Sequence, residues 1–188
     1  MTQIILTLEQ NHIDQIADVA AKKLLANLLT APAISKSFPK IGEFWKEQGG
    51  YLGAIMRGKD TPDYCLIVSP KECEFTAEFG SRGKEIETSD WDGFANTQLM
   101  IKAQTGSYPA AEKCCFDNGF NDWFIGSRRE MRALYANASE LFDPNPWYWS
   151  STQFSAFTAY CQEFEDGGQA SRFKTNELRV RPVRRLFI

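Results

Sequence analysis

The stretch that decides the fold is WYWSSTQFSAFTAYCQEFEDGGQASRFKTNELRVRPVRR, residues 147–185, in which an irregular middle separates two regular ends. Its three leading aromatic residues are typical of a buried anchor. At its far end, Leu178 and Val180 alternate with Arg179 and Arg181, which predicts a strand whose apolar side chains face inward and whose arginines share one side. Those arginines either pair with acidic neighbours or bind an anion.

The segments upstream of this stretch predict strands first and helices second. IGEFWKEQGGYLGAIM (residues 41–56) and DYCLIVSPKECEF (residues 63–75) are typical of strands divided by glycine turns. YPAAEKCCFDNG (residues 108–119) predicts a helix that accepts proline in its first turn and stops at a glycine. The order of strands, helices and strands predicts an α+β domain, in which we expect the first and last strands to pair.

A second helix is predicted over SRREMRALYANA, residues 127–138. Ser127 and Glu130 have the S-x-x-E spacing of a capping box. In a capping box, each of the two side chains accepts a hydrogen bond from the backbone N–H of the other residue. The apolar positions of this segment recur at helical spacing along one face. These positions are Met131, Leu134, Tyr135 and Ala138.

The N-terminal part of the chain predicts a separate amphipathic helix over residues 11–29. Its apolar stripe is Ile13, Ile16, Ala17, Ala20, Leu24 and Leu28. Pro32 and Pro39 interrupt this pattern and indicate a linker. We therefore divide the chain into residues 1–40, for oligomerisation or attachment, and residues 41–188, the main domain. A single helix cannot bury its own stripe, so it packs on the main domain or on copies of itself.

Composition argues against several classes of protein. A net charge of −3 and a pI of about 5.3 give no general attraction to nucleic acid or to an anionic membrane. No apolar run reaches the roughly 18 residues of a membrane span. The first residues lack the pattern of a signal peptide, so we expect synthesis in a cytoplasm without a cleaved leader.

Few residues of this chain suit catalysis or metal binding, and we expect no cofactor. His12 is the only histidine and lies outside the main domain, which leaves that domain no Ser-His or Cys-His pair. The five cysteines form no CxxC and are expected to be thiols in or near the core. Glu163, Glu165 and Asp166 could offer oxygen ligands to Ca²⁺, but solvated turn charges are the simpler interpretation, and we expect no metal site.

Two motifs resemble a large group of bacterial and phage domains with the C-type lectin fold. NDWFIGSRREMRALYAN (residues 121–137) is similar to that group's D-W-x-hydrophobic-P-[ST]-x-x-E-L-x-x-L-Y segment, with Gly126 in place of the usual proline. YWSSTQFSAFTAYCQEFEDGGQ followed by ELRVRPVRR resembles the group's W-S-S-[ST] … V-R-P-V-R ending. The resemblance covers roughly residues 41–188 and implies a C-type lectin-like fold preceded by the N-terminal helix.

The same group includes the variable proteins of diversity-generating retroelements, in which the segment between W-S-S-[ST] and the V-R-P-V-R strand carries the ligand-binding side chains. The resemblance implies display residues at Phe154, Phe157, Thr158, Tyr160, Glu163, Glu165, Asp166, Ser171, Arg172, Phe173, Thr175 and Asn176. It implies scaffold residues at Trp149, Ser150, Ser151, Ala156, Ala159, Phe164, Gly167, Arg179 and Arg181. Aromatic, arginine and small polar side chains are also common in paratopes.

The leading interpretation is a non-enzymatic receptor-binding protein, of the kind found at a phage tail tip, on a virion or as a retroelement-diversified variable protein. Its partner would be a cell-surface macromolecule, protein or glycan. The alternative is an enzyme related to formylglycine-generating enzymes, with Cys161 and Cys114 or Cys115 as a cysteine-based site. A calcium lectin finds no support, because Glu-Pro-Asn and Trp-Asn-Asp triplets are absent from the sequence.

Deleting residues 1–38 tests whether the N-terminal helix assembles the protein. We expect the full chain to be a homo-oligomer, such as a trimer, because the apolar stripe of that helix has no local partner. The shortened chain should then show the mass of a monomer by light scattering. An unchanged mass after deletion, or a monomeric full chain, would contradict the expectation.

Overall fold

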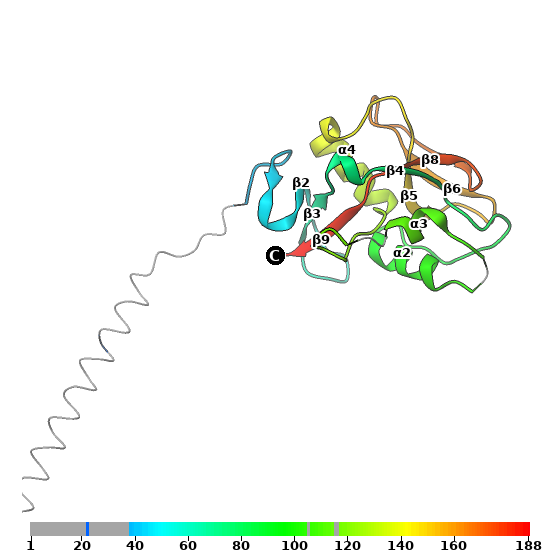
Figure 1. The fold of residues 1–188 in the computed structure, drawn as a ribbon, viewed down its shortest axis with the longest axis horizontal. Helices are drawn as coiled ribbons and strands as arrows, with labels where there is room; N and C mark the ends of the chain where they lie inside the picture. The colour runs from blue at the N-terminus through cyan, green and yellow to red at the C-terminus, as the bar shows by residue number, and fades with distance from the viewer. Residues whose placement is uncertain (1–21, 23–37, 105, 115–116) are drawn as a thin grey trace, which may run out of the picture. The chain divides into compact units, whose positions relative to one another are not determined.

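The structure, a computed structural model, describes Lys22 and residues 38–104, 106–114 and 117–188 (Figure 1). The chain divides into two units, Met1–Phe38 and Pro39–Ile188. Apart from Lys22, the helix expected over residues 11–29 and the linker after it lie outside the described residues. The account that follows therefore concerns the second unit, which is a mixed α+β domain dominated by β-sheet.

Two sheets organise this domain, and both follow from the strand-rich sequence at its two ends. The first has the order β1-β2-β3-β9 and the second the order β4-β8-β5-β6-β7. Neighbours are antiparallel except for a short parallel contact between β5 and β8. The strands are β1 (Phe44–Trp45), β2 (Gly50–Met56), β3 (Tyr64–Val68), β4 (Phe75–Glu78), β5 (Tyr148–Gln153), β6 (Thr158–Gln162), β7 (Gln169–Phe173), β8 (Glu177–Val180) and β9 (Val183–Phe187).

The expectation that the first and last strands pair is wrong. Strand β9 lies against β3, with Leu66 opposite Arg185 and Val68 opposite Val183, whereas β1 occupies the far edge of the same sheet. The physical reason is length and burial. The two residues of β1 form only a short ladder, whereas β3 is buried along all five residues and offers a full apolar edge.

Three α-helices are present among the described residues: α2 (Gly93–Lys102), α3 (Pro109–Cys114) and α4 (Arg128–Ala138). Helix α4 begins with the predicted capping box, because Glu130 N donates to Ser127 Oγ and Ser127 N donates to a carboxylate oxygen of Glu130. Helix α3 begins at Pro109, as predicted. Helix α2 was not anticipated from the sequence. In Figure 1, α2 and α3 lie together, and both contact the second sheet.

Aromatic side chains fill the core, as the opening stretch predicts. Tyr148 and Trp149 are fully buried, and the Trp149 indole donates to the carbonyl of Ala77 at 3.0 Å. Tyr148 packs edge-on against Phe142 and Phe164, which stack on each other with centroids 3.8 Å apart. The anchor therefore ties β5 to β4 on one side and, through Phe142 and Phe164, to the segments that follow α4 and β6 on the other.

The arginines of the RVRPVRR ending are held by carboxylates, which confirms the salt-bridge interpretation. Arg179 and Arg181 both reach Glu74, at 2.6 and 3.1 Å. Arg184 pairs with Asp122 at 2.7 Å. These contacts join the C-terminal strands to segments more than 60 residues away in the chain. The terminal arginines are therefore structural, and they leave little free charge for a ligand.

Arg185 belongs to a second, more deeply buried network around the Glu130 carboxylate. One carboxylate oxygen accepts from the Tyr64 hydroxyl at 2.8 Å and from Arg185 at 2.7 Å. The other accepts from Ser127 N at 2.7 Å and from Gly93 N at 3.1 Å. Burial and the neighbouring carboxylate raise the pKa of Tyr64 far above its usual range, so its hydroxyl remains a donor.

Replacing Glu130 by alanine should be among the most destabilising single changes in this domain. The variant leaves three buried donors without their acceptor and leaves the buried Arg185 guanidinium with Asp92 as its remaining partner. Breaking a buried pair costs about 3–5 kcal/mol. Urea unfolding of Glu130→Ala and of Glu87→Ala, an exposed glutamate, provides the comparison. The control should change the free energy of unfolding by less than about 0.5 kcal/mol. Equal effects in both variants would show that the network contributes nothing.

Candidate binding face

The β6–β7 hairpin places the predicted display residues on two opposite faces. Register pairs Thr158 with Phe173 and Tyr160 with Ser171, so these four side chains share a face. Ala159 and Cys161 alternate with them, point the other way and are buried. The alternation of exposed and buried positions therefore comes from an ordinary antiparallel pleat.

One end of this hairpin carries a cluster of exposed phenylalanines. Phe154, Phe157 and Phe173 are 58%, 51% and 57% exposed. Phe154 packs edge-on against Tyr160 with centroids 5.2 Å apart. The Arg82 guanidinium lies 5.9 Å from the Phe157 ring and 6.0 Å from the Phe173 ring. We call this surface, made by Phe154, Phe157, Thr158, Tyr160, Ser171 and Phe173, the hairpin face.

Arg172 does not belong to the hairpin face, although the sequence groups it with Tyr160 and Phe173. It lies opposite Ala159 in the register, on the other side of the sheet. There its guanidinium covers the Trp147 ring at 4.6 Å. Arg172 is therefore placed to shield a core aromatic at the edge of the sheet.

The acidic display residues lie at the opposite end of the hairpin, beyond Gln162 and about 16 Å or more along the chain from Thr158. Glu163 and Glu165 sit in the turn that follows β6 rather than in the strand itself. The Glu163 carboxylate is occupied, because it accepts the backbone N–H groups of Glu165, Asp166 and Gly168. It organises the turn, while Glu165 and Asp166 remain exposed.

Contact with α4 fixes the position of that turn. Gly167 has a φ of +76°, and an added Cβ would lie 2.1 Å from the Tyr135 ring. Arg132 donates to the Gly167 carbonyl at 2.7 Å. The other two predicted residues, Thr175 and Asn176, are exposed in the β7–β8 turn, next to the phenylalanine end of the hairpin.

Most of the predicted scaffold residues are buried. Trp149, Ser150, Ser151, Ala159, Phe164, Gly167 and Arg181 are buried, and Ala156 and Arg179 are partly so. Ser150 contributes by donating to the carbonyl of Tyr160 at 2.9 Å, which ties β5 to the middle of β6. The hairpin face therefore rests on a supported sheet.

Lys174 is an anchor that sequence reasoning missed, because it stands between two exposed positions, Phe173 and Thr175. Its side chain is fully buried, and Nζ donates to the carbonyl of Lys84 at 2.8 Å and to Gln153 Oε1 at 2.5 Å. These bonds hold the loop that carries Arg82 against the hairpin. The signal that could have found it is position, since Lys174 continues the inward side of β7 beyond Arg172.

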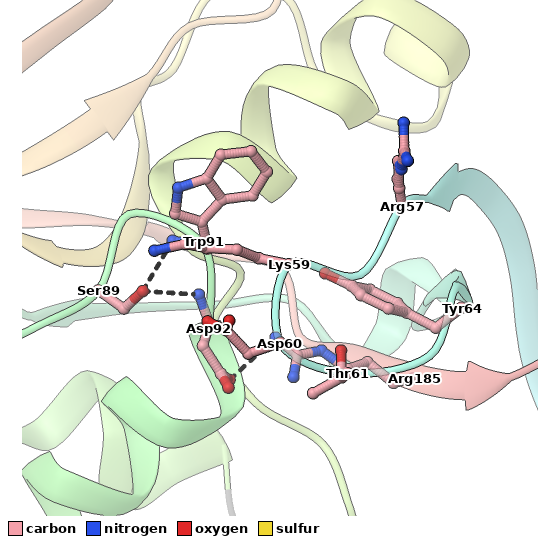
Figure 2. A pocket seen from close by; sticks show the side chains of 9 residues that line it. All are labelled: Arg57, Lys59, Asp60, Thr61, Tyr64, Ser89, Trp91, Asp92 and Arg185. Atoms are coloured by element: carbon pink, nitrogen blue, oxygen red, sulfur yellow. Dashed lines mark hydrogen bonds and ion pairs between the residues drawn. The ribbon is translucent and has the colours of Figure 1, made fainter.

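A hollow on another part of the domain gathers several charged side chains (Figure 2). It is small, about 80 Å³, and is lined by Arg57, Lys59, Asp60, Thr61, Tyr64, Ser89, Trp91, Asp92 and Arg185. Its deepest cation, Arg185, is already paired with Asp92 at 2.9 Å and with Glu130. The hollow is therefore an outer part of the Glu130 network, with little room for a ligand.

Thiols and acidic side chains form no reactive centre in the part of the chain that is described. Cys65 and Cys161 are buried thiols, and burial raises the pKa of Cys161 to about 11. No group of three His, Cys, Asp or Glu side chains among the described residues could hold a metal ion. None of the helices that the structure describes is both long and apolar enough to cross a membrane.

Comparison with known proteins leaves the family of this chain open. The sequence matches no protein-family model, and no curated protein matches it significantly. Among solved structures, it is similar to a fimbrial protein from Bacteroides ovatus ATCC 8483, with a TM-score of 0.47 and 12% identity. The alignment covers 84% of this chain, which spans only 41% of that protein.

The Lys174 anchor predicts a specific pH dependence of stability. Burial lowers the pKa of Lys174 to about 8, partly offset by the Glu85 carboxylate. An unfolded lysine keeps its proton up to about pH 10.4. Between these values the unfolded chain binds more protons, so this lysine's contribution to stability rises with pH.

The comparison is urea unfolding of the natural chain and of Lys174→Met at pH 7, 8, 9 and 10. Relative to the variant, the natural chain should gain free energy of unfolding from about pH 8 upward and show no trend below it. A difference that stays constant over this whole range would contradict a lowered pKa.

Proposed function

We propose that this chain is a non-enzymatic binding protein whose ligand surface is the hairpin face. The observation that carries the proposal is the cluster of Phe154, Phe157 and Phe173, each more than half exposed at one end of a well-supported hairpin. Exposed aromatics grouped beside an arginine are enriched at protein interfaces. Water-exposed apolar surface of this kind is unfavourable unless a partner covers it.

The support beneath the face also favours binding. Lys174 and Gln153 hold the Arg82 loop, and Ser155 links to Thr158 through their hydroxyl groups at 2.9 Å. A surface whose backbone is held in this way loses less conformational entropy when it binds. The partner we propose is a macromolecule on a cell surface, protein or glycan.

We further propose that the domain is C-type lectin-like and related to phage and retroelement-diversified variable proteins. The support is the order of its motifs. The W-S-S-T segment lies in β5, the V-R-P-V-R segment links β8 to β9, and the capped helix α4 precedes both. In such proteins the connecting strands and loops carry the ligand-binding side chains, which here form the hairpin face.

The cysteine-based alternative is less well supported than binding. A nucleophilic cysteine requires a thiolate at neutral pH and access to substrate. Cys161 is 1% exposed, its thiol donates to the Ala170 carbonyl at 3.4 Å, and its raised pKa keeps it protonated. These features suit a core thiol.

Single alanine substitutions of Phe157 and Phe173 test the proposed face. Labelled protein is added to a panel of candidate bacterial host cells, and bound fluorescence is measured by flow cytometry. If either ring is a hot spot, truncation should cost about 2 kcal/mol of binding, or roughly 30-fold in affinity. The free energy of unfolding should change by less than about 0.5 kcal/mol, as at other surface sites.

Two controls separate binding from folding. Phe44→Ala removes a phenylalanine of matched exposure, 51%, on β1, and should bind like the natural chain. Trp149→Ala removes the buried anchor and should unfold the domain. The proposal fails if the Phe44 variant loses as much binding as the face variants, or if the face variants are as unstable as Trp149→Ala.

A further inference from the structure

A second hollow, beside the hairpin face, is lined mainly by arginines. The first turns of α4 place Arg128, Arg129 and Arg132 around a space of about 250 Å³, completed by Asp90 and Gln169. The hollow is continuous with the hairpin face: Gln169 begins β7, and the Arg128 guanidinium lies 4.1 Å from the centre of the Tyr160 ring.

Neutral groups make the closest contacts of these arginines. Arg128 Nε donates to Gln169 Oε1 at 3.0 Å, and Arg132 donates to the Gly167 carbonyl. Arg129 stacks on the Trp91 ring at 3.9 Å and makes no ion pair within the described residues. These contacts therefore orient the arginine side chains without neutralising their positive charge.

The hollow consequently carries more positive than negative charge. Three guanidinium groups face one carboxylate, Asp90, whose nearest approach is 4.0 Å to Arg128. The arginines of the C-terminal strands are different, since each has a carboxylate within about 3 Å. The charge around this hollow is thus unlike that of the C-terminal strands, where every arginine is paired with a carboxylate.

The position of the arginines also opposes local helix stability. Arg128 and Arg129 occupy the first two positions of α4, where the helix dipole favours negative side chains. The backbone donors there are already used, since Arg128 N bonds Thr152 Oγ1 and Arg129 N bonds the Asp90 carbonyl. Only the guanidinium groups remain to receive a ligand. Arg128 gains its bond to Gln169 in exchange, whereas Arg129 gains only its stacking on Trp91. A side chain that breaks a local rule with so little structural gain is expected at a functional site.

We propose that this hollow is an anion-binding subsite that receives one oxyanion group of the ligand held by the hairpin face, a carboxylate, sulfate or phosphate. Planar guanidinium groups pair with such oxygens through two parallel hydrogen bonds. The inference rests on the proposed binding function for its biological setting. The chemistry of the hollow can be tested without the ligand.

The test is a titration of the full chain with sodium acetate, sulfate or phosphate at constant ionic strength, followed by NMR of the arginine Nε–H groups. Saturable shifts at Arg129 and Arg132 are expected for at least one ion. Response to acetate assigns the subsite to carboxylates, and response to sulfate or phosphate assigns it to tetrahedral groups. A purely linear response to every ion, as from general screening, overturns the proposal.

Variants make the test specific to this hollow. Arg129→Gln combined with Arg132→Gln should weaken binding of the responding ion by about tenfold or more, because two charge-assisted donors are lost. Asp90→Asn should strengthen it, since the only carboxylate in the hollow is neutralised. Arg57→Gln, which removes an exposed arginine elsewhere, should leave it unchanged. Equal affinity in all three variants overturns the subsite.

One comparison separates failure of the subsite from failure of the proposed function. Phe157→Ala and Phe173→Ala should retain the saturable anion response, because neither ring lines the hollow. If the anion response is intact but no cell is bound through the hairpin face, the subsite stands and the binding function is wrong. If cells are bound and the anion response is absent, the binding function stands and the subsite is wrong.

Discussion

The fold depends on one buried carboxylate. Glu130 is fully buried and joins β3, the start of α2, the start of α4 and β9 through Tyr64, Gly93, Ser127 and Arg185. Removing such a group from water costs several kcal/mol, so it is tolerated only where its lone pairs are satisfied and a cation is close. Both conditions hold here, with four donor groups around two oxygens. The same geometry leaves no room at Gly93, where a Cβ would lie 2.5 Å from the carboxylate.

This network also explains how α4 serves two sides of the domain. The inner side of the helix supplies Glu130, Met131 and Leu134 to the core, which sets its rotation about its own axis. With that rotation fixed, Arg128 and Arg132 point toward the β6–β7 hairpin and bond Gln169 and Gly167 there. The hairpin is thus positioned from α4 as well as from β5, and the exposed phenylalanines at its far end rest on both supports.

Local patterns were sufficient to predict some elements, and long-range contacts decided the others. The capping box of α4 could be predicted from the sequence because both partners lie within four residues. Helix α2 could not be predicted in this way. Its buried positions include Asn96 and Thr97, whose side chains bond Ser89 and the N–H of Ile125, whereas the apolar Leu99 is exposed. A search for an apolar stripe overlooks such a helix. Pairing of β9 with β3 likewise depends on contacts over more than 100 residues, which no local pattern specifies.

The candidate site was likewise predicted in part from the sequence, and long-range contacts decided the rest. The family resemblance indicated Thr158 and Tyr160 as outward-facing residues of β6. The register of β7, however, depends on the length of the intervening turn, and that register moves Arg172 to the opposite face. Arginine content alone was equally ambiguous, because the motif RVRPVRR appeared the more basic surface. Its arginines are paired with carboxylates, whereas those of α4 are held by neutral oxygens and by aromatic rings. The acids that pair with an arginine, more than the number of arginines, therefore decide whether a basic segment serves the fold or remains available to a ligand.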